Sequence, residues 1–322
     1  MFPFVLFLVF VQQGLCVPTS HTQSHFNWES TKQLIAFGDS YTFIQGTHGY
    51  PGYSFMGSYL PDQFAFTPHQ LLSNQIVQNF SGTAEGGPNW VEYLTGCVAG
   101  ADISEEFTPP HHNFTTPLVN QTQQFLTYAH PVLEKQPSFQ NHALVAIWIG
   151  INDIGDTSKY DVFFPDLYDS LWDTIFTQSV QPLFHAGYRN FLLVNLPPLD
   201  RTPGAVNSGN PFPNKTMLNW FGDSQARYSK AFAAAHPSAK AMIFDANSFL
   251  NDVLDNPTHY GIANTTAFCQ GYANADVLTN PGKYGCSPID EYFWFNSGHM
   301  TSHVHKLLAP QIREFLMEDS HS

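Results

Sequence analysis

Four short apolar runs, each followed by a longer amphipathic stretch, limit the possible folds of this chain more than any other feature. The runs cover residues 33–37, 143–149, 190–195 and 241–244. Strands that alternate with helical patterns are typical of a parallel sheet with helices on both faces. A fifth strand is expected near residues 97–101, after a short helical pattern. The sequence therefore predicts an α/β fold with three α/β/α layers and a mostly parallel, five-stranded sheet.

The clearest helical faces lie in the second half of the chain. Apolar residues recur at helical spacing at Leu167, Leu171, Ile175 and Leu183, and again at Val304, Leu307 and Leu308. Pro310 lacks a backbone N–H and its ring clashes with the preceding turn. We therefore expect two separate helical pieces around Pro310.

Residues 1–16 have the composition of a secretory signal peptide. Residues 2–11 are nearly all apolar and too short to cross a bilayer, although no Lys or Arg precedes them. A buried N-terminal segment is the alternative interpretation. The remaining residues, 17–322, contain no repeat, low-complexity tract or charged linker, so we expect a single domain with insertions at 46–74 and 256–290.

The predicted route is secretion to an extracellular location, where disulfides form. Cys269 and Cys286 bracket a short Gly/Asn/Pro-rich segment, and we predict a disulfide between them. Cys97 is expected to be a buried free thiol. Asn-x-Ser/Thr sequons, the expected glycosylation sites, occur at Asn79, Asn113, Asn120, Asn214 and Asn264.

The charge balance excludes one class of partner. The formal net charge is -14 with only 12 Lys and Arg residues, whereas nucleic-acid binding draws most of its affinity from cationic contacts to phosphate. An acidic chain with 15% aromatic residues suits neutral molecules such as sugars. We therefore expect a small-molecule or oligosaccharide partner, with no nucleic acid and no membrane span.

Gly38-Asp39-Ser40 directly follows the first apolar run, which places a serine hydroxyl at the carboxyl edge of the sheet. The tripeptide alone is weak, because all three residues are common in turns. Its weight comes from three later segments: Gly86-Gly87-Pro88-Asn89-Trp90, Gly150-Ile151-Asn152-Asp153 and Asn296-Ser297-Gly298-His299.

Together these four segments resemble the GDSL or SGNH hydrolases. The stretches Gly-Pro-Asn-Trp-Val-Glu-Tyr-Leu and Tyr-Phe-Trp-Phe-Asn-Ser are most similar to the fungal acetylesterases of carbohydrate esterase family sixteen. The resemblance implies the flavodoxin-like SGNH hydrolase fold and a site where Ser40, Gly87, Asn152 and His299 converge.

Each of these residues has a role in ester hydrolysis. Serine is a poor nucleophile until a base takes its proton, and His299 is the expected base for Ser40. The resemblance supplies three oxyanion donors: the backbone N–H groups of Ser40 and Gly87 and the side-chain amide of Asn152. Asp39 and Asp153 are expected to hold their local turns.

Position 296 departs from the family pattern, which commonly has an aspartate three residues before the histidine. Asn296 can accept the imidazole N–H and fix the tautomer, but it cannot offset imidazolium charge. Three hypotheses follow. We favour a dyad oriented by Asn296 or a backbone carbonyl; Asp290 or Glu291 could substitute instead, or the chain could be an inactive relative.

A metal site is the weaker interpretation of His299, His303 and His305. On a helix residues 303 and 305 do not share a face, and no nearby Asp, Glu or Cys completes the set. We therefore expect no metal and no cofactor. The predicted function is a secreted serine esterase that hydrolyses small acyl esters, acetyl above all, of carbohydrates; a lipolytic GDSL esterase and a catalytically weak carbohydrate-binding relative are the alternatives.

Overall fold

A computed structural model describes residues 26–43, 83–94, 103–104, 106–108 and 116–321. Four parallel strands form one sheet in the order β1-β2-β3-β4. Their bounds are Gln33–Gly38, Ala143–Trp148, Asn190–Val194 and Lys240–Phe244. Each matches one of the four predicted apolar runs to within one residue. The predicted fifth strand at 97–101 lies outside the described residues, so the sheet described has four strands rather than five.

Alternate residues of each strand enter different layers of the protein. On β2, Leu144, Ala146 and Trp148 pack beneath α10 (Ala246–Asp255) and α11 (Ser302–Asp319). Val145 and Ile147 pack beneath α6 (Phe164–Ile175) and α9 (Lys215–Ala235) on the other face. All six residues of β2 are buried, as expected for a parallel strand covered on both faces. The result is the predicted three-layer α/β/α architecture.

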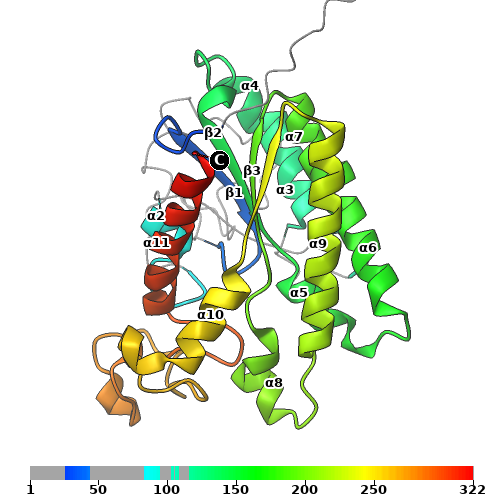
Figure 1. Cartoon of the computed structure of the whole chain (residues 1–322). Helices are drawn as coiled ribbons and strands as arrows, with labels where there is room; N and C mark the ends of the chain where they lie inside the picture. The colour runs from blue at the N-terminus through cyan, green and yellow to red at the C-terminus, as the bar shows by residue number, and fades with distance from the viewer. Residues whose placement is uncertain (1–25, 44–82, 95–102, 105, 109–115, 322) are drawn as a thin grey trace, which may run out of the picture.

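The helices divide between the two faces of the sheet (Figure 1). One layer contains α3, α5, α6, α7 and α9, and the other contains α2, α10 and α11. The helices are α2 Trp90–Leu94, α3 Leu118–Gln124, α4 His130–Leu133, α5 Ile151–Asp156, α6 Phe164–Ile175, α7 Gln181–His185, α8 Pro203–Asn207, α9 Lys215–Ala235, α10 Ala246–Asp255 and α11 Ser302–Asp319. No helix among the described residues is long and apolar enough to cross a membrane.

The expected break at Pro310 is wrong, because α11 continues through it. Pro310 is exposed, as is Lys306, whose carbonyl loses its helical partner there. Water can therefore satisfy that carbonyl. The opposite face of α11, with Val304, Leu308 and Ile312, is buried against the sheet, and this packing maintains one helix.

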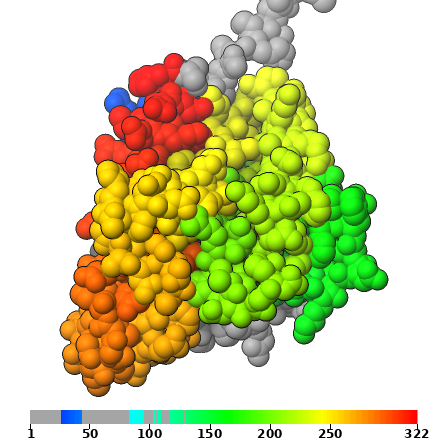
Figure 2. Space-filling model, turned by 60° about the horizontal axis from the view of Figure 1, so that its bottom comes forward, coloured from blue at the N-terminus to red at the C-terminus, as the bar shows by residue number. Residues whose placement is uncertain are grey.

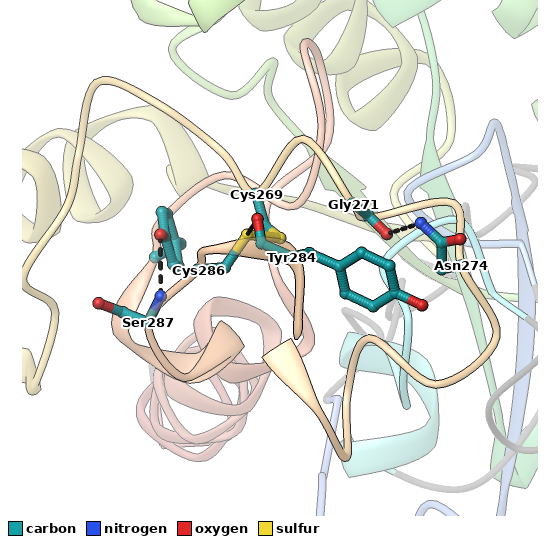
Figure 3. The surroundings of a disulfide bond; sticks show 7 residues. Cys269, Gly271, Asn274, Tyr284, Cys286 and Ser287 are labelled. Carbon is teal, nitrogen blue, oxygen red and sulfur yellow. Dashed lines mark hydrogen bonds between the residues drawn. A yellow bond between two sulfur atoms is a disulfide. The ribbon is translucent and has the colours of Figure 1, made fainter. Parts of the chain in front are cut away.

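The expected disulfide between Cys269 and Cys286 is present, with a Cα–Cα distance of 5.6 Å. It closes a segment of turns that stands out as a lobe, orange in Figure 2. Within the lobe the Asn274 side chain donates to the carbonyl of Gly271, and the ring of Tyr284 lies beside the disulfide (Figure 3). Both cysteines pack with Val277, Ile289 and Phe295 in a small core of their own. Phe295 connects this lobe to the loop that contains His299.

Candidate active site

The turn after β1 presents Ser40 at the carboxyl edge of the sheet. Gly38 pairs with Trp148 of β2, and a Cβ on Gly38 would lie 2.2 Å from the Trp148 carbonyl oxygen, so only glycine fits. Asp39 is fully buried, and its carboxylate accepts the N–H of Tyr41 at 3.1 Å and of Ile151 at 3.3 Å. These bonds connect the Ser40 turn to the start of α5.

His299 lies between Ser40 and Asn296, although 259 positions of sequence separate it from the serine. Nε2 of His299 is 2.7 Å from Oγ of Ser40, and Nδ1 is 3.0 Å from Oδ1 of Asn296. The same amide oxygen accepts the backbone N–H groups of Gly298, at 3.0 Å, and of His299, at 2.8 Å. Two backbone donors therefore identify this atom as the oxygen.

This arrangement sets the tautomer of the imidazole. An amide oxygen only accepts hydrogen bonds, so Nδ1 of His299 carries the proton and Nε2 is free to accept from the Ser40 hydroxyl. Asp290, by contrast, is exposed, and no contact from Asp290 or Glu291 to the His299 ring occurs among the described residues. The structure thus places Asn296, not a carboxylate, at Nδ1.

The Gly86-Gly87 turn lies against the first turn of α11. A Cβ on Gly87 would lie 2.8 Å from both Cβ and Oγ of Ser302. Ser302 donates to the Pro88 carbonyl at 2.6 Å, and the Thr83 hydroxyl donates to the Gly87 carbonyl. The carbonyls of Gly87 and Pro88 are therefore held by side chains, which restricts the orientation of the peptides that follow these two residues.

The three expected oxyanion donors come from the turn after β1, the start of α5 after β2 and the Gly86-Gly87 turn. Asn152 lies in the first turn of α5, directly after β2, and β2 is the neighbour of β1, which leads to Ser40. Within the described ranges, no acceptor contacts the N–H of Ser40, the N–H of Gly87 or the side-chain amide of Asn152.

A fully buried pair, Glu85 and His305, lies behind this turn and was not predicted from the sequence. Oε1 of Glu85 is 3.8 Å from Nε2 of His305, whose Nδ1 accepts the N–H of Trp90 at 3.2 Å. Burial raises the pKa of Glu85 well above its ordinary value and lowers the pKa of His305 well below its own. Burial therefore favours the neutral form of each side chain. Because 220 positions of sequence separate Glu85 and His305, only the structure shows that they are in contact.

The remaining predicted residues have the following surroundings. Asp153 is buried and accepts the N–H of Ile103. His303 contacts the Tyr260 carbonyl at 3.0 Å and points away from His305; in the described part of the chain no three His, Cys, Asp or Glu side chains are grouped to hold a metal. Among the sequons Asn120 and Asn214 are exposed and Asn264 is half-buried. Asn79, Asn113, Cys97 and residues 1–16 lie outside the described residues.

Comparison with known proteins finds a matching family and several relatives. The sequence model of the GDSL-like lipase/acylhydrolase family matches residues 34–312. An acetylesterase of Thermothelomyces thermophilus is 28% identical over 300 residues, which cover 88% of each chain. An acetylesterase of Hypocrea jecorina is 23% identical, also over 88% of each chain. A GDSL esterase/lipase of Arabidopsis thaliana is 24% identical over 86% of this chain and 88% of its own.

Proposed function

The chain belongs to the GDSL-like lipase/acylhydrolase family, and from this premise we propose that it removes acetyl groups from carbohydrates through an acyl-enzyme on Ser40. It is a carboxylic ester hydrolase that resembles acetylesterases. The observation that carries the proposal is the continuous hydrogen-bonded line from Ser40 through His299 to Asn296.

The reaction steps follow from the position of the protons along the hydrogen bonds from Ser40 through His299 to Asn296. Nε2 of His299 takes the Ser40 proton as Oγ bonds to the acetyl carbon, and the carbonyl oxygen gains the negative charge. The N–H groups of Ser40 and Gly87 and the amide of Asn152 stabilise that charge. The bond between the acetyl carbon and the sugar oxygen then breaks, and that oxygen takes the proton from Nε2 and leaves as a hydroxyl group. Water repeats the sequence on the acetyl-Ser40 ester, and acetate leaves.

The substrate class is supported by charge and by the relatives. Two of the relatives reported above are named acetylesterases. The formal net charge of -14 favours neutral ligands over polyanions. We also propose that the protein is secreted and glycosylated, with residues 17–322 as one domain; the Cys269–Cys286 disulfide is the kind of bond that persists in oxidising compartments.

A lipolytic esterase is the second candidate, because a matched plant relative is named a GDSL esterase/lipase. Long acyl chains need an extended apolar groove, whereas an acetyl group needs only a small recess. The two candidates therefore differ in how the rate depends on acyl length.

The experiment compares 4-nitrophenyl esters of two, eight and sixteen carbons, together with acetate release from an acetylated oligosaccharide. We expect kcat/KM to fall by at least ten-fold from two to eight carbons and acetate to be released from the sugar. Ser40→Ala is the control and should abolish both. A preference for the longer chains would favour the lipase, and an inactive, folded wild-type protein would favour the carbohydrate-binding alternative.

A further inference from the structure

Tyr41, the residue after the nucleophile, stacks on the base. The ring centroids of Tyr41 and His299 are 5.4 Å apart and the ring planes differ by 29°. The single turn that follows β1 therefore supplies both Ser40, which contacts Nε2 of the imidazole, and an aromatic face that covers the imidazole ring. Neither the resemblance to the family nor the roles proposed above assign a function to this side chain.

The ring of Tyr41 is fixed from several directions. The side chain is fully buried, and its hydroxyl donates to the carbonyl of Gly298 at 2.6 Å. Its backbone N–H donates to Asp39, and the edge of the ring packs against Trp148 with centroids 5.5 Å apart. Burial raises the pKa of the Tyr41 phenol well above its ordinary value, so the hydroxyl keeps its proton and remains a donor.

A neighbouring aromatic face is useful to His299 because Asn296, the residue that contacts Nδ1, is neutral. Proton transfer from Ser40 converts the imidazole into an imidazolium, and the amide oxygen of Asn296 offers a dipole rather than a full negative charge. A cation within about 6 Å of an aromatic centroid is attracted to the face of that ring. The distance between Tyr41 and His299 meets this condition.

We propose that Tyr41 is a positioning residue for the esterase reaction, which stabilises the imidazolium of His299 through its ring face and holds the Gly298 carbonyl beside it. This inference rests on the proposed function, since it requires His299 to gain a proton during turnover. The ring partly replaces the carboxylate that position 296 lacks.

Other titratable groups face the same ring. The ring centroids of His305 and Tyr41 are 5.8 Å apart. The carboxyl groups of Glu85 and Asp39 also lie near Tyr41, where any negative charge on them raises the pKa of its phenol. Burial keeps His305 neutral by lowering its pKa, and Asp39 directs its oxygens to the N–H groups of Tyr41 and Ile151. A substitution of Tyr41 leaves His305, Glu85 and Asp39 in place. A change in the pH profile of the Tyr41 variants is therefore attributed to the loss of the Tyr41 ring.

The test is the pH profile of kcat/KM for 4-nitrophenyl acetate in Tyr41→Phe and Tyr41→Leu. A cation–π contact of ordinary strength predicts that Tyr41→Leu lowers the plateau about 2- to 30-fold and moves the acidic limb about 0.4 to 1.5 pH units to lower pH. The direction follows because the ring stabilises the protonated base, and its loss makes the imidazole lose its proton more readily. Tyr41→Phe retains the ring and should keep the limb within about 0.3 pH units.

Tyr188→Leu is the matched control. Tyr188 is equally buried but packs on the other face of the sheet, against Phe125 and His130. It should lose stability in thermal melts without a shift of the limb. If Tyr41→Leu does not fold, 3,5-difluorophenylalanine in place of Tyr41 serves instead, because fluorination weakens the ring face at almost constant shape, and the limb should again move to lower pH relative to Tyr41→Phe.

The outcomes separate the inference from the proposed function. If Ser40→Ala abolishes activity and the limb stays fixed in both Tyr41→Leu and the fluorinated variant, the role of Tyr41 is wrong while the serine esterase stands. If Ser40→Ala retains activity, the proposed function fails and the inference fails with it.

Discussion

The amide oxygen of Asn296 lies 3.0 Å from Nδ1 of His299, where a triad would have a carboxylate. The same oxygen also accepts two backbone N–H groups of the loop. Asn296 therefore both shapes the loop and orients the base, and its replacement by aspartate would keep every acceptor while adding charge.

We expect Asn296→Asp to raise kcat about 5- to 10-fold, because a hydrogen bond to a charged group contributes roughly 1 to 1.5 kcal/mol more than a neutral one. Asp290→Asn should leave kcat within two-fold, since Asp290 is exposed and makes no described contact with His299. Steady-state kinetics on 4-nitrophenyl acetate measure both. A large loss in Asp290→Asn alone would contradict the orientation by Asn296.

The amide of Asn152 is predicted to act only on the developing oxyanion. Asn152→Ala should lower kcat about 10²- to 10³-fold with little change in KM, because loss of one oxyanion donor costs roughly 3 to 4 kcal/mol of barrier. Asn152→Asp, which replaces a donor with an acceptor of negative charge, should be at least as damaging. An unchanged kcat in Asn152→Ala would exclude this residue from the site.

Gly87→Ala tests the position of the second donor. The added methyl group would lie 2.8 Å from Ser302, so the turn must move and carry its N–H away from the oxyanion; we expect kcat to fall at least ten-fold. Gly222→Ala on α9 is the matched control, because its methyl group meets nothing within 4 Å. That control should retain kcat and gain up to about 1 kcal/mol of stability. Equal kinetics in the two variants would argue against a role for the Gly87 N–H.

Glu85 should make stability depend on pH. Its pKa is raised in the folded protein, so its contribution is fully present below the ordinary carboxyl pKa near 4.5 and is lost as pH rises toward the folded pKa. Glu85→Gln should therefore have the same free energy of unfolding as the wild type at pH 4 and a higher one at pH 8. Urea unfolding at both pH values provides the comparison.

The lowered pKa of His305 affects the free energy of unfolding in the opposite direction, because its contribution is lost as pH falls below about 6.5. This contribution is common to the wild type and to Glu85→Gln. A constant difference between them at all pH values would show that Glu85 does not titrate as described.

The Cys269–Cys286 disulfide should stabilise the lobe and, through Phe295, the loop of His299. Replacing both cysteines by serine should cost about 3 kcal/mol, because a cross-link of this loop length mainly restricts the unfolded chain. The melting temperature and kcat should decrease together. A variant with full stability and activity would show that the lobe is independent of the site.

Local apolar patterns predicted the four strands that the structure describes. All four described strands begin within one residue of the apolar runs, because burial on both faces of a parallel sheet requires continuous apolar sequence. Asn296 could be named as a candidate partner of His299 because the family pattern has an orienting residue three positions before the histidine.

What the sequence could not reveal depends on contacts between distant segments. The continuity of α11 through Pro310 depends on packing against the sheet, which overrides the local preference of proline. The buried pair of Glu85 and His305, and the stacking of Tyr41 on His299, join residues more than 200 positions apart. Hydrophobic periodicity contains no signal for such pairs.

Covalent labelling of Ser40 by a fluorophosphonate, read by peptide mass spectrometry, tests the central claim most directly. We expect a single adduct on Ser40 in the wild-type protein and its loss in both Ser40→Ala and His299→Ala, with thermal melts showing that each variant is folded. An adduct on another residue, or no adduct on folded wild-type protein, would contradict the assignment of Ser40 as the nucleophile.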